Sequence, residues 1–272
     1  MGKELTKKIL LLCLFVITTG FILYTGFHSA RAASKNINSK QLDKTITIYL
    51  AGDSTVSTYP KSLSPRSGWG QELAKMFDGV VVINNQATRG RSSKSFIEEG
   101  RLNRILHDIK TGDYLFIQFG HNDEKIWDSK RYTKPSSTYK SYLKQYIDGA
   151  RVKGAIPVLI TPVQRMCFAE DGTALESHGQ YPLAMKELGR EEHVPVIDLA
   201  AKSRELFQQL GPRNTKKMFL WLKAKEYPNY PNGASDSTHF QKYGARKIAR
   251  LVINGINELS LPIKEHVLLE YQ

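Results

Sequence analysis

The chain has 272 residues, of which 41% are hydrophobic and 24% are charged, and its formal net charge is +13. This composition excludes a disordered or fibrous protein, and the length suits one well-buried domain behind a targeting segment. The positive charge favours a polyanionic partner (nucleic acid, anionic lipid, cell-wall polymer or acidic polysaccharide), although a basic surface without a dedicated partner has the same charge.

The first 32 residues have the pattern of an export signal. Three lysines precede an apolar stretch from residue 9 to about residue 27, and the cleavage pattern Ala30-Arg31-Ala32 follows. We predict that residues 1–32 form a signal peptide cleaved after Ala32, so that the mature protein is secreted. The apolar stretch is nearly long enough to span a bilayer, and the alternative is an uncleaved anchor that holds the protein on the outer face of the membrane.

Loss of this segment removes four basic residues and one acidic residue, which lowers the formal net charge from +13 to +10. Cys167 is then the only cysteine, so the mature protein has no internal disulfide and depends on its core for stability. Residues 33–43 are polar and predict a short linker into a domain of residues 44–272.

Five short β-branched apolar runs predict strands, at residues 45–51, 80–84, 114–119, 156–161 and 194–199. Apolar residues at helical spacing predict helices at residues 69–77, 101–109, 139–150, 181–192, 199–210 and 248–259. Nearly continuous apolar strands are typical of a parallel sheet that is buried on both faces. The alternation of strands and helices along the chain therefore predicts a three-layer αβα sandwich with a five-stranded, mainly parallel, flavodoxin-like sheet.

In such sheets, ligands bind beyond the carboxyl ends of the strands, which is where catalytic residues are expected. Gly52-Asp53-Ser54-Thr55 directly follows the first predicted strand. A serine there has its hydroxyl at the sheet edge and its N–H at a helix N-terminus, where developing negative charge is stabilised. A single Gly-Asp-Ser turn is also ordinary loop chemistry, so this motif alone does not predict a nucleophile.

Two further polar loops follow the next two strands. Asn84 to Gly90 comes after the second strand, and Gly90 can expose a backbone N–H. Gly120-His121-Asn122-Asp123 comes after the third strand, and the Asn122 side chain can donate a hydrogen bond to an oxyanion. The three loops are therefore expected to meet at one crevice.

Asp236-Ser237-Thr238-His239 precedes the final predicted helix. In a turn, an aspartate three residues before a histidine can bind imidazole Nδ1, which leaves Nε2 free to take a proton from Ser54. An isolated pair of this kind is more often a helix N-cap with an incidental histidine. The occurrence of all four motifs in this order at strand ends makes coincidence the weaker interpretation.

With these motifs, the chain resembles the SGNH (GDSL-type) hydrolases from Tyr49 to Phe240. It is most similar to their rhamnogalacturonan acetylesterase branch, through strings that extend beyond the catalytic blocks. These strings are residues 49–55, 68–70, 90–96, 99–101, 119–123 and 236–240.

The resemblance implies a serine esterase that removes O-acetyl groups from an acidic pectic polysaccharide, rhamnogalacturonan. It implies that Ser54 is the nucleophile, that His239 is the general base and that Asp236 orients His239. The implied oxyanion hole consists of the Ser54 N–H, the Gly90 N–H and the Asn122 side chain. Many relatives carry a small residue before the oxyanion glycine, whereas this chain has Arg89, which narrows the site or adds a cation near the acyl group.

Several other residues are candidates for substrate binding, and each has a structural alternative. Asp53 and Asp123 are expected to organise their loops, and His121 is more typical of a loop-holding residue than of a second catalytic histidine. Aromatic residues in polar stretches either stack on sugars or anchor loops, whereas Trp69 begins a helix and is expected in the core. The possible substrate-binding residues are Arg89, His121, Trp127, His178 and Trp221.

No H-E-x-x-H motif and no cluster of Cys and His at ligand spacing occurs in the sequence, so we expect neither a metal site nor another cofactor. No basic stripe, zinc finger or aromatic RNA motif indicates a nucleic-acid partner, and membrane contact is expected only if the N-terminal segment stays uncleaved. The oligomeric state is not predicted.

Other functions stay open from the sequence. One is another SGNH activity, namely a xylan or peptidoglycan O-acetylesterase or a lysophospholipase, although the charged residues 125–134 do not resemble an apolar lid. A different class is a noncatalytic polysaccharide-binding module that has kept the fold, which has no need of the complete Ser54, Asp236 and His239 set.

Overall fold

Five parallel strands form the central sheet. They are β1 (Ile46–Gly52), β3 (Val81–Asn85), β4 (Tyr114–Gln118), β5 (Ile156–Ile160) and β6 (Val196–Ile197). Their order is β3-β1-β4-β5-β6, which is the flavodoxin-like arrangement. The predicted fold class is confirmed, and β6 is shorter than the run of residues 194–199 indicated.

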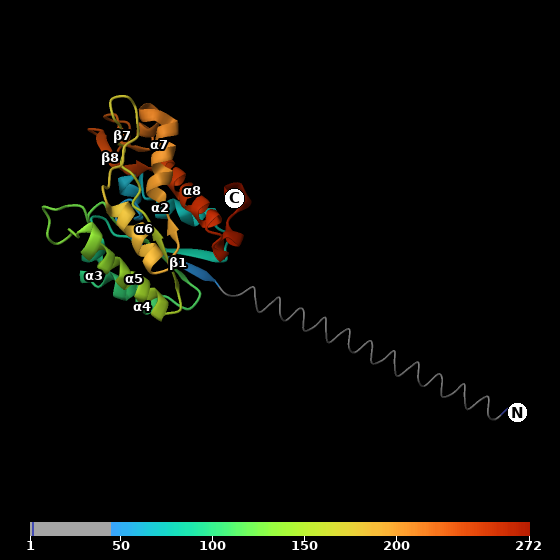
Figure 1. Cartoon of the computed structure of the whole chain (residues 1–272). Coiled ribbons are helices and arrows are strands. Elements are labelled where there is room, and N and C mark those ends of the chain that lie inside the picture. The colour runs from blue at the N-terminus through green and yellow to red at the C-terminus, as the bar shows by residue number, and fades with distance from the viewer. Residues whose placement is uncertain (1, 3–44) are drawn as a thin grey trace. The chain divides into compact units, whose positions relative to one another are not determined.

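The computed structural model describes Gly2 and residues 45–272, and residues 45–272 form one compact unit (Figure 1). The predicted signal peptide (residues 1–32, apart from Gly2) and the predicted linker (residues 33–43) lie outside the described residues. Within the described part of the chain, no helix has the length and apolar character needed to cross a membrane.

Helices cover both faces of the central sheet. They are α2 (Trp69–Leu73), α3 (Ser93–Glu98), α4 (Arg101–Asp108), α5 (Lys140–Val152), α6 (Tyr181–Glu191), α7 (Leu199–Lys216) and α8 (Lys242–Glu258). Figure 1 shows α3, α4 and α5 on one side of the sheet and α2 and α8 on the other. The short α3 was not predicted.

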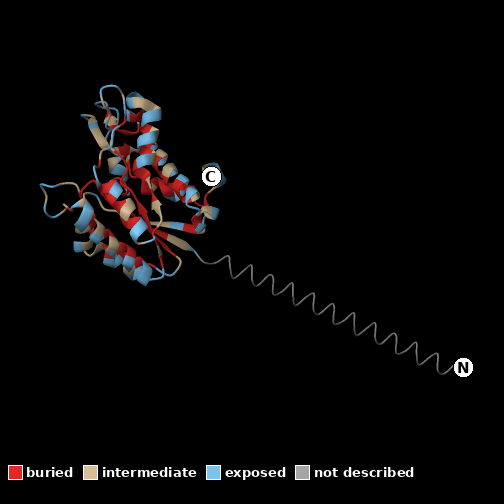
Figure 2. Ribbon diagram, in the orientation of Figure 1, coloured by how far each residue is buried: buried red, intermediate tan, exposed pale blue. Residues whose placement is uncertain are grey.

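Alternate residues of the strands enter two separate cores. Ile48 and Leu50 of β1 pack with α2, α7 and α8, whereas Tyr49 and Ala51 pack with the helices α3 to α6. Side chains alternate across a strand, so a strand that is apolar at every position fills both cores. Figure 2 shows this burial as a continuous buried layer between the exposed faces of the helices.

A second, antiparallel sheet was not predicted from the sequence. It contains β2 (Arg66–Ser67), β7 (Phe219–Leu222) and β8 (Ala234–Gln241), in the order β2-β8-β7. Strand β8 is mostly polar and has no alternating pattern, so its pairing depends on its neighbours more than on its own propensity. This sheet carries Asp236 and His239, which the sequence motif marked as candidate site residues.

The motif from Asp236 to His239 is therefore not a simple turn before the last helix, as its sequence indicated. It is an irregular part of β8, because Phe240 pairs with Phe219 while Asp236 pairs with the next residue, Leu220. The three residues between them, 237–239, bulge out of the ladder. The bulge carries His239 away from the sheet.

Candidate active site

Residues 53–55, which follow the carboxyl end of β1, contain the candidate nucleophile Ser54 and are called the nucleophile loop. Asp53 is fully buried, and its Oδ1 accepts hydrogen bonds from the Thr55 N–H and the Thr55 hydroxyl, both at 2.8 Å. Ser54 stands between these two residues and is half-buried. The loop is thus fixed from inside while the serine stays accessible.

A chain of buried polar side chains supports this loop. Trp69 Nε1 donates to Gln118 Oε1 at 2.8 Å, and Gln118 Nε2 donates to the Thr55 hydroxyl at 2.8 Å. Trp69, Gln118 and Thr55 are each 1% exposed. The core position expected for Trp69 is confirmed, and Gln118 is a supporting residue that the sequence analysis missed.

Ser54, His239 and Asp236 are in hydrogen-bond contact in that order. His239 Nε2 lies 2.9 Å from Ser54 Oγ, and His239 Nδ1 lies 2.7 Å from Asp236 Oδ2. A carboxylate only accepts hydrogen bonds, so Nδ1 carries the proton and Nε2 accepts from the serine hydroxyl. This is the tautomer that a general base for Ser54 requires.

Asp236 is fixed as an ionised acceptor. Its Oδ1 accepts the backbone N–H groups of Thr238 at 2.8 Å and His239 at 2.9 Å. Burial raises the pKa of Asp236, but the hydrogen bonds and charge of His239 and these N–H groups outweigh burial and lower the pKa to about 2. The carboxylate is therefore available to stabilise an imidazolium at neutral pH.

The bulge of β8 is attached to the nucleophile loop through β2. Ser67 of β2 pairs with Phe240, and the N–H of Trp69, two residues later, donates to the Thr55 carbonyl at 2.9 Å. A Cβ at Gly68 or Gly70 would come within 2.6 Å of backbone atoms of Val56. The two glycines around Trp69 thus let this segment, which pairs with β8, approach the backbone of Val56 closely.

Gly90 lies between two anchors that connect all three loops. The Thr88 N–H donates to the Gly52 carbonyl at 2.9 Å, and Asn122 Nδ2 donates to the Arg91 carbonyl at 3.1 Å. Gly90 itself has φ of 77°, and a Cβ there would meet open space. Among residues 45–272, no acceptor is bound by the Ser54 or Gly90 N–H, so both remain available for an oxyanion.

Two buried histidines lie beneath these loops. His121 is 3% exposed, and its ring packs edge-on against that of His178 with centroids 4.3 Å apart. His178 is 1% exposed, with Nε2 2.8 Å from the Val163 carbonyl and Nδ1 3.0 Å from Glu124 Oε2. Both rings, which the sequence analysis considered for substrate binding, are buried inside the protein, and neither nitrogen of His121 has a hydrogen-bond partner among residues 45–272.

Asp123 ties that loop to the start of α3. Its carboxylate accepts the Ser93 N–H at 3.0 Å and the Thr133 hydroxyl at 3.0 Å, and it is fully buried. Burial raises the pKa of Asp123 to about 7, against the lowering effect of these hydrogen bonds. Its surroundings agree with the loop-organising role expected for it.

The remaining candidate substrate residues differ in exposure. Arg89 is exposed beside Gly90, and Trp127 is 78% exposed in the loop after β4. Trp221 lies in β7, half-buried, with Lys216 Nζ 4.0 Å from its ring centroid. Arg89 and Trp127 are thus free to meet a ligand, whereas the Trp221 ring already has a cation against it. No cluster of three metal-ligating side chains occurs in the part of the chain that the structure describes.

The sequence of this chain is similar to several curated proteins. It is 49% identical over 226 residues to the rhamnogalacturonan acetylesterase RhgT of Bacillus subtilis, which covers 83% of this chain and 96% of the relative. A rhamnogalacturonan acetylesterase of Emericella nidulans is 49% identical over 230 residues, covering 77% of this chain and 84% of the relative.

Solved structures share the fold. The protein YXIM of Bacillus subtilis superposes with a TM-score of 0.69 at 29% identity over 80% of this chain, and the chain spans 58% of its length. An acetylxylan esterase of Geobacillus stearothermophilus, Axe2, gives a TM-score of 0.55 at 16% identity over 78% of this chain and 94% of that chain, a likeness of fold alone.

Residues 50–247 match the sequence profile of the GDSL-like Lipase/Acylhydrolase family. This range contains the nucleophile loop, both candidate oxyanion loops and the bulge of β8. The chain therefore belongs to the GDSL-like lipase/acylhydrolase family and is a carboxylic ester hydrolase.

Proposed function

We propose that this protein is a carbohydrate acetylesterase that removes O-acetyl groups from rhamnogalacturonan by Ser-His-Asp acyl transfer. The observation that carries the mechanism is the continuous contact from Asp236 through His239 to Ser54, with distances of 2.7 and 2.9 Å. The substrate rests on the relatives named rhamnogalacturonan acetylesterase, which are similar along most of their length.

In the first half of the reaction, Ser54 Oγ attacks the acetyl carbonyl carbon while His239 Nε2 takes the hydroxyl proton. The negative charge that develops on the carbonyl oxygen is stabilised by the N–H groups of Ser54 and Gly90 and by Asn122 Nδ2. Asp236 stabilises the imidazolium through Nδ1. The tetrahedral intermediate then collapses, and His239 returns the proton to the sugar oxygen, which leaves as a hydroxyl group.

In the second half, water replaces the sugar in the site. His239 takes a proton from the water as it attacks the acetyl-Ser54 carbonyl, and the same donors stabilise the second tetrahedral intermediate. Collapse releases acetate and returns the proton to Ser54 Oγ. Every proton transfer passes through His239 Nε2, which is why its alignment with Ser54 is decisive.

Acetate release from two polymers tests both the reaction and the substrate. The purified full chain should release acetate from acetylated rhamnogalacturonan, whereas Ser54→Ala should lower kcat by about 10⁴-fold or more. Ser62→Ala, which changes an exposed serine of the neighbouring loop, is the matched control and should keep full activity. Release from acetylated xylan alone would contradict the pectic substrate, and activity retained by Ser54→Ala would contradict the nucleophile.

Secretion is a separate part of the proposal and rests on residues 1–32 alone. Expression in a secreting bacterium should yield extracellular protein whose first residue is Ala33. A full-length protein that stays in the membrane fraction would instead support the uncleaved anchor.

A further inference from the structure

Two guanidinium groups lie against the ring of Tyr59, beside the nucleophile. Arg66 Cζ is 5.1 Å and Arg89 Cζ is 5.7 Å from the ring centroid. Tyr59 is 4% exposed, and its hydroxyl donates to the Ser54 carbonyl at 2.7 Å. One tyrosine ring therefore separates the two cations from the backbone of the nucleophile.

The positive charge of this group, which consists of Tyr59, Arg66 and Arg89, is only weakly neutralised. Within residues 45–272, the one carboxylate that contacts Arg66 is Asp236, with Oδ2 3.7 Å from an Arg66 terminal nitrogen, and no carboxylate contacts Arg89. Arg66 Nε is buried and has no hydrogen-bond partner among the same residues. The Arg66 side chain as a whole is 22% exposed, so a ligand can reach the exposed part of its guanidinium.

Asp236 does not need Arg66 to hold its position. Its Oδ2 already accepts from His239, and its Oδ1 accepts two backbone N–H groups. The 3.7 Å separation is also longer than a hydrogen bond. The guanidinium of Arg66 thus has donors left for another acceptor.

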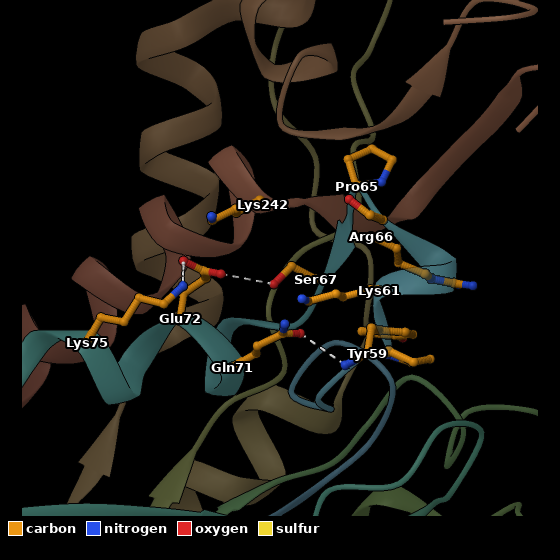
Figure 3. A pocket seen from close by; sticks show the side chains of 11 residues that line it. Tyr59, Lys61, Pro65, Arg66, Ser67, Gln71, Glu72, Lys75 and Lys242 are labelled. Carbon is orange, nitrogen blue, oxygen red and sulfur yellow. Dashed lines mark hydrogen bonds and ion pairs between the residues drawn. The ribbon is translucent and has the colours of Figure 1, made fainter. Parts of the chain in front are cut away.

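Tyr59 and Arg66 also line a pocket of about 200 Å³, which Figure 3 shows with its lysines. Lys61 and Lys242 also line it, and neither has a carboxylate within ion-pair distance among the residues that the structure describes. The one carboxylate of the lining, Glu72, is 1% exposed and already binds Lys75 at 2.9 Å. An anionic chain that passes the nucleophile therefore meets further unpaired cations.

We propose that Arg66 and Arg89 bind the carboxylate of a uronic acid residue in the polymer and so select acidic over neutral acetylated polysaccharides. The inference rests on the proposed acetylesterase function and names the residues that recognise its substrate class. Guanidinium groups offer planar, paired donors that match a carboxylate, and stacking on Tyr59 holds them in place before the substrate arrives.

The test compares two polymers that differ only in the carboxylate. Acetylated rhamnogalacturonan and its carboxyl-reduced, acetylated counterpart are offered to the wild type, Arg66→Gln, Arg89→Gln and the double variant. p-Nitrophenyl acetate serves as an uncharged small ester. Arg250→Gln is the matched control, because Arg250 stacks on Tyr271 at 5.4 Å on another part of the surface.

The wild type should have a higher kcat/KM on the acidic polymer than on the carboxyl-reduced polymer. Each single variant should lower this ratio of kcat/KM values about tenfold, mainly by raising KM for the acidic polymer. Arg66→Lys should recover only part of the preference, since lysine keeps the charge without the paired donors. Activity on p-nitrophenyl acetate should fall less than activity on the acidic polymer, because this ester has no carboxylate for the arginines to bind, and Arg250→Gln should change nothing.

An unchanged ratio in the double variant would overturn this inference and leave the acetylesterase function intact. An equal loss on all three substrates would also overturn it, because that pattern assigns the arginines to positioning of the triad. If the wild type releases acetate from neither polymer but hydrolyses p-nitrophenyl acetate, the proposed polysaccharide substrate fails together with the inference.

Discussion

Of the aspartate–histidine pairs in the described part of the chain, two lie next to Ser54, and only one of these two reaches the surface. Asp236 and His239 have side chains 31% and 21% exposed, with Oδ2 and Nδ1 2.7 Å apart. Asp53 and His121 have side chains 0% and 4% exposed, and their nearest oxygen and nitrogen are 3.2 Å apart. The residue types are identical, but the access to solvent and the alignment are not.

The difference in surroundings gives the two pairs different chemistry. His239 Nε2 faces Ser54 Oγ at 2.9 Å, whereas the outer neighbour of His121 is the ring of His178. Burial lowers the pKa of His121 to about 4, which outweighs the opposing effect of the Asp53 carboxylate and keeps the imidazole neutral at pH 7. His121 is thus buried behind the loop that carries Ser54, whereas His239 is accessible and in hydrogen-bond contact with Ser54.

Among changes to the two pairs, Asp236→Asn should have the largest effect on activity. The amide presents an N–H where the carboxylate accepted one, so it favours the His239 tautomer that has no free Nε2. We expect kcat on a small acetate ester to fall by about 10⁴-fold, with little change in thermal unfolding. If kcat for ester hydrolysis falls by less than tenfold, Asp236 does not orient the base.

Asp53→Asn should have the opposite balance of effects. Asp53 is fully buried and fixes Thr55 through two hydrogen bonds, and its replacement places an amide against the His121 ring. The free energy of unfolding should fall by about 1–3 kcal/mol in urea titrations, because the buried donors of Thr55 lose a charged acceptor and an NH₂ group replaces the oxygen 3.2 Å from His121 Nδ1.

Activity distinguishes this result from a catalytic role. At temperatures where Asp53→Asn stays folded, its kcat should fall far less than that of Asp236→Asn. Unchanged stability with a kcat loss as large as that of Asp236→Asn would instead make the buried pair part of the proton-transfer machinery.

The pH dependence of stability separates the pairs further. The unfolded His121 imidazole takes a proton below its ordinary pKa of 6.5, whereas the folded imidazole takes one only near pH 4. The unfolded state therefore binds more protons between these values, and stability is lost as the pH falls from 6.5 to 4. The slope from one such group is at most about 1.4 kcal/mol per pH unit.

Asp123 contributes a slope of opposite sign, so wild-type data alone are not sufficient. Its pKa is raised to about 7 in the folded protein, and its contribution to stability is lost as the pH rises toward that value. The difference between the wild type and His121→Gln, measured by urea titration from pH 4 to 7, isolates the histidine. A difference that does not vary with pH would show that His121 titrates normally in the folded protein.

The sequence predicted the sheet and the catalytic motifs because both depend on local pattern. β1, β3, β4 and β5 lie within one residue of the predicted runs. The inner strands β1, β4 and β5 are largely apolar because both of their faces are buried, and the edge strand β3 begins with three β-branched residues. Short motifs at the ends of elements marked Ser54 as the candidate nucleophile and His239 as the candidate base, and the structure brings these two side chains into contact. Local sequence pattern was therefore sufficient to predict the parallel sheet and the contact between Ser54 and His239.

Features that depend on pairing between distant segments were not predictable in this way. The polar β8 becomes a strand only through β2 and β7, so the bulge that presents His239 has no signal of its own. Gln118 had a detectable signal, since it is the one polar side chain near the end of an otherwise apolar strand. Tyr59 had none, because a tyrosine in a loop gives no indication that it binds the Ser54 carbonyl.

Tyr59→Phe should have the smallest effect. It tests whether the Tyr59 hydroxyl positions the backbone of Ser54, which contacts the accessible pair. The change removes the hydroxyl that donates to the Ser54 carbonyl at 2.7 Å, and the ring that contacts Arg66 and Arg89 remains. Burial raises the pKa of Tyr59 to about 12, so the hydroxyl is a donor throughout the range in which ester hydrolysis is measured.

The free energy of unfolding should fall by about 1 kcal/mol, as for one buried hydrogen bond, and kcat on p-nitrophenyl acetate should fall by less than about fivefold. Tyr271→Phe, in the other arginine-stacked tyrosine, is the control and should change neither quantity. A large kcat loss without a loss of stability would mean that the backbone of Ser54 is held in place by Tyr59 alone, since the buried chain through Thr55 and Gln118 would then be insufficient to position the nucleophile.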